Sequence, residues 1–132
     1  MIEYFAEFLG TLVLILLGNG VVANVLLNRT GGHNGGWIVI TFGWGIGVFV
    51  GVILSTKYSG AHLNPAVTIG LALAGLFEPV KVVPFIVAQF CGAITGSWMV
   101  YLFYRDHFRI TSEPGVKKAC FCTAPGIRKW SR

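Results

Sequence analysis

Three long apolar runs, over residues 4–27, 37–54 and 80–104, constrain this chain more than any other feature of its sequence. A helix needs about 20 predominantly apolar residues to cross the hydrocarbon core of a bilayer, and each run is close to that length. In addition, 55% of the residues are hydrophobic and only 11% are charged, which is more apolar surface than a soluble domain of this size can bury. The sequence therefore predicts a multi-pass protein of the cell membrane.

Small residues recur at every fourth position in the second and third runs. At this spacing they share one face of a helix, where they let two helix backbones approach closely in lipid. We interpret them as packing residues. They are Gly43, Gly47 and Gly51 in the second run, and Ala88, Gly92 and Gly96 in the third.

The stretch "SGAHLNPAVT", residues 59–68, interrupts this apolar pattern. It leads into an apolar run over residues 66–77 that is too short to span a bilayer. Asn64 is a strong N-cap residue, and Pro65 is favoured at the first helical position. The stretch therefore predicts a re-entrant loop and half-helix over residues 59–75, with the helix beginning at Pro65.

The residues before this half-helix predict a site for a neutral polar solute. We expect residues 59–62 to be extended, so that the carbonyls of Gly60, Ala61 and His62 form a line of acceptors. Irregular backbone at membrane depth is tolerated where it is buried in protein or lines a water-filled cavity. The amide of Asn64 would supply donors, and the positive end of the half-helix would repel cations.

These motifs resemble the first signature loop of the major intrinsic proteins, the aquaporins and glycerol facilitators. Beside "SGAHLNPAVT", the segments "AEFLGT" at residues 6–11 and "AQFCGA" at 88–93 are similar to that family at the right separations. The resemblance implies an all-α membrane protein with three transmembrane helices plus one re-entrant half-helix. This is one half of an inverted-repeat six-helix channel. Residues 1–104 would form the N-terminal channel repeat, and residues 105–132 an extramembrane loop or tail.

The resemblance also implies roles for single residues. Asn64, Pro65 and Ala66 form the Asn-Pro-Ala (NPA) motif, and Trp44 takes the aromatic position of the selectivity constriction, which favours glycerol over water. Glu7 would accept hydrogen bonds from the backbone of the loop. Alternatives for Glu7 are a proton relay or an acid that snorkels to the interface, and the alternative for Trp44 is packing alone.

Gln89 would face inward and hydrogen-bond around the loops. His33 and His107 fall in expected loops, where we expect them to be exposed.

The expected function is a passive channel for glycerol and other small uncharged polyols, with water. Because the second signature loop has no match, we expect a truncated half-channel that is inactive alone. A water-selective aquaporin half is one alternative. A small proton-coupled exporter using Glu7 is another, although such proteins need four full spans. The complete channel is expected to be a homotetramer in the lipid bilayer.

Other functional classes receive little support from the sequence. It shows no Ser–His–Asp, Cys–His or paired-carboxylate pattern, so we expect no enzyme. Its three cysteines have no regular spacing, which argues against a disulfide framework. Cys120 and Cys122 could hold a metal only with partners that are not evident nearby, so we expect neither a metal nor another cofactor. The net charge of +5 comes mostly from the tail, beside so many apolar residues that we expect no nucleic-acid partner.

The charge distribution conflicts with the topology that the resemblance implies. A cytoplasmic N-terminus puts the tail outside after three spans, whereas basic residues near span ends favour the cytoplasmic side. Only Lys57 and Lys81 fall on the other side. The basic residues of the tail are Arg105, Arg109, Lys117, Lys118, Arg128, Lys129 and Arg132.

Overall fold

Three long helices and three short ones make up the part of the chain that the computed structural model describes, residues 1–123. The remainder of the predicted tail, residues 124–132, lies outside the described residues, as do Arg128, Lys129 and Arg132. The helices are α1 (Ile2–Leu26), α2 (Trp37–Ser59), α3 (Pro65–Leu73), α4 (Pro79–Phe103), α5 (Arg105–Ile110) and α6 (Pro114–Ala119).

Helices α1, α2 and α4 are each long and apolar enough to cross a membrane. Helix α3 has nine residues and is too short to do so. The prediction of three spans and one shorter helix is therefore confirmed. Helix α2 continues five residues beyond the apolar run that ends at residue 54. It ends at Ser59 because Gly60, which follows, adopts the left-handed conformation that commonly terminates a helix.

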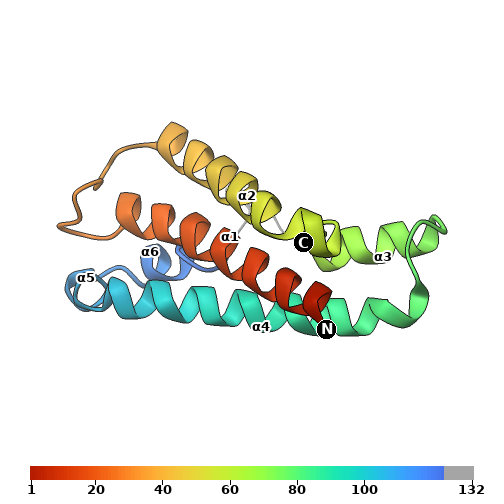
Figure 1. Ribbon diagram of the computed structural model, residues 1–132. Coiled ribbons are helices and arrows are strands. Elements are labelled where there is room, and N and C mark those ends of the chain that lie inside the picture. Colours follow the sequence, from red (N-terminus) through yellow and green to blue (C-terminus); the bar gives the residue numbers. More distant parts are fainter. Residues whose placement is uncertain (124–132) are drawn as a thin grey trace, which may run out of the picture.

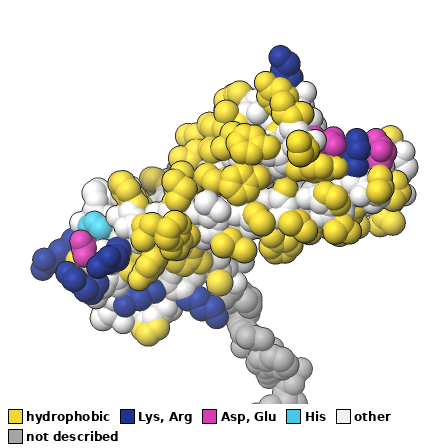
Figure 2. All heavy atoms as spheres, turned by 60° about the horizontal axis from the view of Figure 1, so that its bottom comes forward, with side chains coloured by type: hydrophobic (Ala, Val, Ile, Leu, Met, Phe, Trp, Pro, Cys, Tyr) yellow, Lys and Arg dark blue, Asp and Glu magenta, His cyan; other side chains and the backbone are white. Residues whose placement is uncertain are grey.

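Helix α1 lies between α2 and α4 and packs against both (Figure 1). Helix α3 lies beside the first turns of α4 at one end of the bundle, while α5 and α6 lie at the opposite end. Many large apolar side chains of these helices are exposed, and they cover much of the face seen in Figure 2. Such a surface is suited to lipid or to further protein.

The small residues of α2 and α4 are where these helices approach α1. A Cβ atom added to Gly51 would lie 2.8 Å from the carbonyl oxygen of Gly10, and one added to Gly96 would lie 2.6 Å from that of Leu12. At Gly92 an added Cβ would collide with the carbonyl of Phe8. The predicted close packing along these stripes is confirmed at these positions.

The segment after α4 is more ordered than the predicted tail. Phe108, Thr111 and Cys120 are buried, and Phe108 and Cys120 pack with Ala23 and Leu27 of the α1 end. The hydroxyl of Thr111 accepts a hydrogen bond from the backbone N–H of Asn28 at 3.0 Å. Helices α5 and α6 therefore close one end of the bundle.

The expectation of an exposed His107 is wrong. Its Nδ1 lies 2.9 Å from the carbonyl oxygen of Asn28, and the side chain is half-buried because α5 folds back onto the end of α1. His33, in the loop between α1 and α2, is exposed as expected.

Replacement of Gly92 by alanine tests the packing of α4 on α1. The new methyl group would have to displace the backbone at Phe8, and overpacking of this kind costs about 1–3 kcal/mol. We expect Gly92→Ala to lower the melting temperature of the purified protein in detergent. Gly45→Ala is the matched control, because an added Cβ there meets nothing within 4 Å. Equal melting temperatures for the two variants would contradict close packing at Gly92.

The three cysteines should differ in their reaction with a membrane-impermeant maleimide. Burial raises the pKa of Cys120 to about 11, so the reactive thiolate forms only at strongly alkaline pH. Cys91 is exposed on the surface of α4, a membrane-spanning helix, where lipid excludes the reagent. We therefore expect labelling at neutral pH at the exposed Cys122 alone, with Cys120 unlabelled while the protein is folded.

Mass spectrometry of labelled peptides measures each site, and Cys122→Ser provides the control that should stay unlabelled at neutral pH. Labelling of Cys120 as fast as Cys122 at neutral pH would contradict the burial of Cys120.

Candidate functional site

The loop that joins α2 to α3 has a strained backbone. Gly60 caps α2 with φ +83°, and Ala61 and Leu63 have φ of +56° and +52°. The expectation of an extended segment is therefore wrong, because the chain passes from α2 to α3 in five residues and turns its peptide groups inward. A left-handed conformation costs about 1–2 kcal/mol at each residue that is not glycine. Interactions elsewhere must hold this loop in place.

The carboxylate of Glu7 supplies those interactions. Its Oε1 accepts hydrogen bonds from Ser59 Oγ at 2.6 Å and from the backbone N–H of His62 at 2.9 Å. Its Oε2 accepts from the backbone N–H of Leu63 and from Gln89 Nε2, both at 2.7 Å. The Glu7 side chain is fully buried, so four donors replace the water that an ionised carboxylate would otherwise need.

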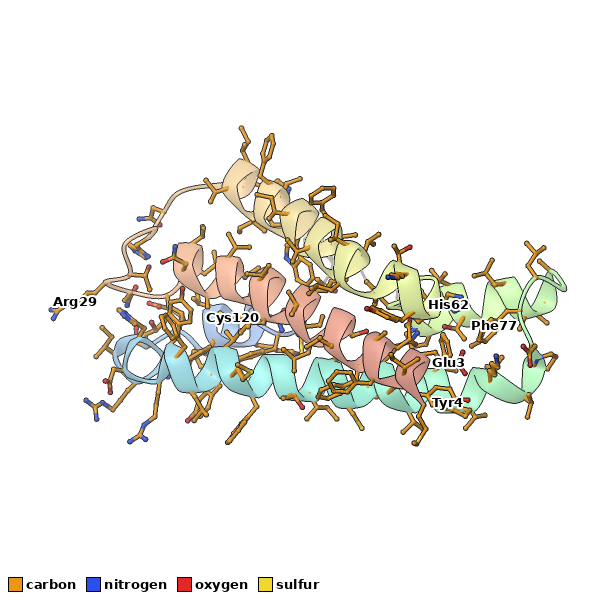
Figure 3. All side chains as sticks on the ribbon, viewed as in Figure 1. Glu3, Tyr4, Arg29, His62, Phe77 and Cys120 are labelled. Atoms are coloured by element: carbon orange, nitrogen blue, oxygen red, sulfur yellow. The ribbon has the colours of Figure 1, made fainter. Side chains whose placement is uncertain are left out.

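Thr68 of α3 connects this network to the half-helix. Its Oγ1 accepts a hydrogen bond from Gln89 Nε2 at 3.0 Å and lies 3.0 Å from Nδ1 of His62. The His62 ring packs against Phe77 and Phe85, with centroid distances of 4.6 and 5.1 Å. Figure 3 shows His62 beside Phe77 at the same end of the bundle as Glu3 and Tyr4. Helices α1, α3 and α4 are thus joined through buried polar side chains.

Asn64 caps the half-helix. Its Oδ1 accepts a hydrogen bond from the backbone N–H of Ala66 at 2.8 Å, and Pro65 occupies the first helical position. The Asn64 side chain is exposed, and the hydrogen bonds of the described residues include none from its Nδ2. Two N–H donors therefore point away from the cap and can reach another molecule.

A groove of about 600 Å³ runs along the bundle beside this loop. Of the predicted pore-lining residues it contains Trp44, Ala61, His62 and Asn64, whereas Gly60 does not line it. Gly60 instead forms the cap of α2. The remaining lining residues are Thr11, Leu14, Ile15, Val48, Val52, Leu63, Pro65, Val67, Gln89, Phe90 and Ala93.

Trp44 both lines the groove and packs on α1. The side chain is half-buried, and its ring lies so close to Gly18 that a Cβ atom there would collide with it. The two interpretations of Trp44 from the sequence are therefore compatible, since one face of the ring can pack while the residue borders the groove.

Thr11 is a groove residue that sequence reasoning missed. Its Oγ1 and the Oε1 of Gln89 are buried, and within the described part of the chain neither oxygen has a hydrogen-bond partner. Thr11 follows Glu7 by four residues in "AEFLGT" and so shares its helix face, a spacing that could have revealed it. Both oxygens are enclosed by protein, so they lie behind the surface of the groove rather than on it.

Comparison with known proteins places this geometry in a family. The family model described as "Major intrinsic protein" matches residues 1–131. The chain is 55% identical to the probable glycerol uptake facilitator protein of Thermotoga maritima, over 98% of this chain and 56% of that protein. It is 54% identical to the glycerol uptake facilitator protein of Streptococcus pneumoniae, over 97% of this chain and 55% of that protein.

A solved structure agrees with these relatives. The X-ray structure of the aquaglyceroporin from Plasmodium falciparum superposes with a TM-score of 0.75 at 43% identity, covering 81% of this chain and 43% of that one. The family resemblance and the fold predicted from it are confirmed. The chain spans about half the length of the curated relatives it matches.

Replacement of Glu7 by glutamine tests the network around its carboxylate. Glutamine carries an NH₂ group in place of one carboxylate oxygen, and this group would face the two donors that the oxygen accepts from. A hydrogen bond to a charged group is worth about 1.5–3 kcal/mol. We expect Glu7→Gln to destabilise the protein by about 3 kcal/mol, measured as thermal unfolding in detergent by circular dichroism.

Glu3→Gln is the control, because Glu3 makes only a partly exposed ion pair with Lys81 and should contribute less than about 1 kcal/mol. If both variants unfold at the same temperature, the Glu7 carboxylate does not hold the loop.

Proposed function

Because this chain belongs to the major intrinsic protein family, we propose that it forms one side of a passive membrane channel for glycerol and other small uncharged polyols, with water as a second permeant. The observation that carries the proposal is the groove beside the Glu7-held loop, which the free amide of Asn64 borders.

The chemistry of this groove suits a polyol. Glycerol carries hydroxyl groups along one edge and C–H groups along the other. Val48, Val52 and Phe90 offer apolar contacts, while Asn64 offers donors. We interpret the carbonyls of Ala61 and His62 as acceptors for the hydroxyl groups of the polyol.

Two features favour neutral permeants over ions. The described residues that line the groove include no Asp, Glu, Lys or Arg. The N-terminus of α3 begins at Pro65 on the groove, and its partial positive charge repels cations. These features support a channel for uncharged solutes.

The alternative functions are less well supported. A proton-coupled exporter would need a Glu7 carboxylate that is free to exchange protons, but four donors occupy it in a fully buried position. A water-selective channel would differ mainly at the constriction. Trp44 favours glycerol there, because an indole face suits the carbon backbone of a polyol, and the glycerol facilitator relatives support the same choice.

The proposed channel needs a second half. The groove is open along one side, and the chain spans about half of its relatives, so further helices and a second half-helix would complete the pore. We include in the proposal a cytoplasmic N-terminus, a homotetramer of complete channels and the absence of enzymatic activity, all from the family resemblance.

The test joins this chain to the second half of the Thermotoga maritima relative and reconstitutes the fusion in liposomes. We expect glycerol to enter faster than into empty liposomes, as measured by reswelling in stopped-flow light scattering. The 132-residue chain alone should stay at the background rate, because its groove has no opposite wall. A fusion that inserts in equal amount but lets glycerol enter only at the background rate would contradict the proposal.

Asn64 variants separate the cap from the pore donor. Asn64→Asp keeps the cap, since aspartate is about as good an N-cap, but removes both N–H donors and adds a charge. In the fusion we expect Asn64→Asp to retain folded protein and to lose at least about tenfold in glycerol flux, which corresponds to a permeation barrier about 1.4 kcal/mol higher.

Asn64→Ala should reduce the amount of folded protein as well, because losing the cap costs about 1 kcal/mol. Flux is normalised to folded protein in the membrane. Parental flux in Asn64→Asp would mean that Asn64 is a cap and nothing more.

A further inference from the structure

A second groove, of about 590 Å³, lies at the opposite end of the bundle from the Glu7 network. It shares no lining residue with the groove beside the Glu7-held loop. Four of its lining residues are basic, Arg105, Arg109, Lys117 and Lys118, and the others are aromatic. We propose that this basic groove binds the phosphate of an anionic phospholipid headgroup. Figure 2 shows Lys and Arg side chains gathered at one end of the molecule.

The position of the groove matches the depth of a lipid headgroup. Helix α4 ends at Phe103, and Arg105 follows two residues later, at the level where a span leaves the hydrocarbon. Tyr101 belongs to the last turn of α4 and lines the groove, as aromatic residues do at the membrane interface. The groove therefore opens where the bilayer surface meets the protein.

Aromatic packing gives the groove a fixed apolar floor. The ring of Phe108 lies 5.6 Å from that of Tyr101 and stacks on that of Phe121 at 5.5 Å. Phe108 is itself buried against the ends of α1 and α4. A floor of this kind suits the glycerol and upper acyl region of a lipid and offers little to a free inorganic anion.

The positive charge of the groove is poorly compensated. Within the described part of the chain, a single ion pair includes a residue of this groove. It joins Arg109 to Asp106 at 3.5 Å, and both side chains are well exposed. By contrast, Lys81 at the other end of the bundle lies between Glu3 and Glu78, at 3.4 and 3.0 Å. A lipid phosphate would supply the missing negative charge.

The basic residues of this groove are among those that cause the conflict between charge and topology. With a cytoplasmic N-terminus these basic residues face outside, where they oppose the usual orientation signal. Each Lys or Arg near an anionic headgroup contributes attraction to it, so these residues favour anionic lipid in whichever leaflet the groove meets. Lipid binding here does not require conduction through the groove beside the Glu7-held loop.

The experiment measures lipid binding to the 132-residue chain by native mass spectrometry. We expect phosphatidylglycerol to bind more tightly than phosphatidylcholine, whose headgroup has no net charge. Lys117→Gln combined with Lys118→Gln should weaken phosphatidylglycerol binding by roughly tenfold. Arg105→Gln combined with Arg109→Gln, both exposed, should give the same loss even if the first pair disturbs folding.

Two controls separate a site from net charge. Arg29→Gln combined with Lys57→Gln removes two charges outside the groove and should leave binding unchanged; Arg29 lies in the loop between α1 and α2 (Figure 3). Lys117→Arg combined with Lys118→Arg keeps the charges and should keep the affinity.

Three results would overturn the proposal. The first is an equal affinity of the parent chain for phosphatidylglycerol and phosphatidylcholine. The second is a loss of phosphatidylglycerol binding in the Arg29 and Lys57 control as large as that in the groove variants. The third is displacement of phosphatidylglycerol by inorganic phosphate added at the same molar concentration as the lipid.

Discussion

A single buried carboxylate organises one end of this protein. Glu7 is a charge-bearing group in an apolar helix, and it is tolerable there because two backbone N–H groups, one hydroxyl and one amide converge on it. The same bonds hold Ala61 and Leu63 in left-handed conformations that the chain would otherwise avoid. The orientation of the half-helix, and with it the position of Asn64, therefore depends on one side chain of α1.

Tight helix packing makes this arrangement geometrically possible. The approach of α2 and α4 to α1 at glycines brings Gln89 and the α2–α3 loop within hydrogen-bond distance of Glu7. Larger residues at those positions would separate the helices by more than a hydrogen bond can tolerate. The small residues of α2 and α4 and the hydrogen bonds to Glu7 are therefore linked. The small residues set the separation of the helices, and the hydrogen bonds can form only at that separation.

Much of this could be predicted from the sequence, for identifiable reasons. Run length predicted the spans, and the chemistry of Asn64 and Pro65 predicted the start of α3 at the residue observed. The backbone of residues 60–63 could not be predicted, because its left-handed turns arise from bonds to a residue more than 50 positions away. The docking of His107 and Cys120 was missed for a related reason, since hydropathy does not reveal which short helices fold back onto a span.

The separation of Glu7 from its partners along the chain has a consequence for synthesis. Ser59 follows Glu7 by 52 residues and Gln89 by 82, so the first span leaves the ribosome long before its acid can be satisfied. An acid at the centre of a span costs on the order of 3 kcal/mol on insertion, and Glu7 costs less because it lies in the second turn of α1, close to the membrane interface. The carboxylate of the nascent α1 therefore remains near the interface until α4 arrives, and the burial of Glu7 is a late step that needs all three spans.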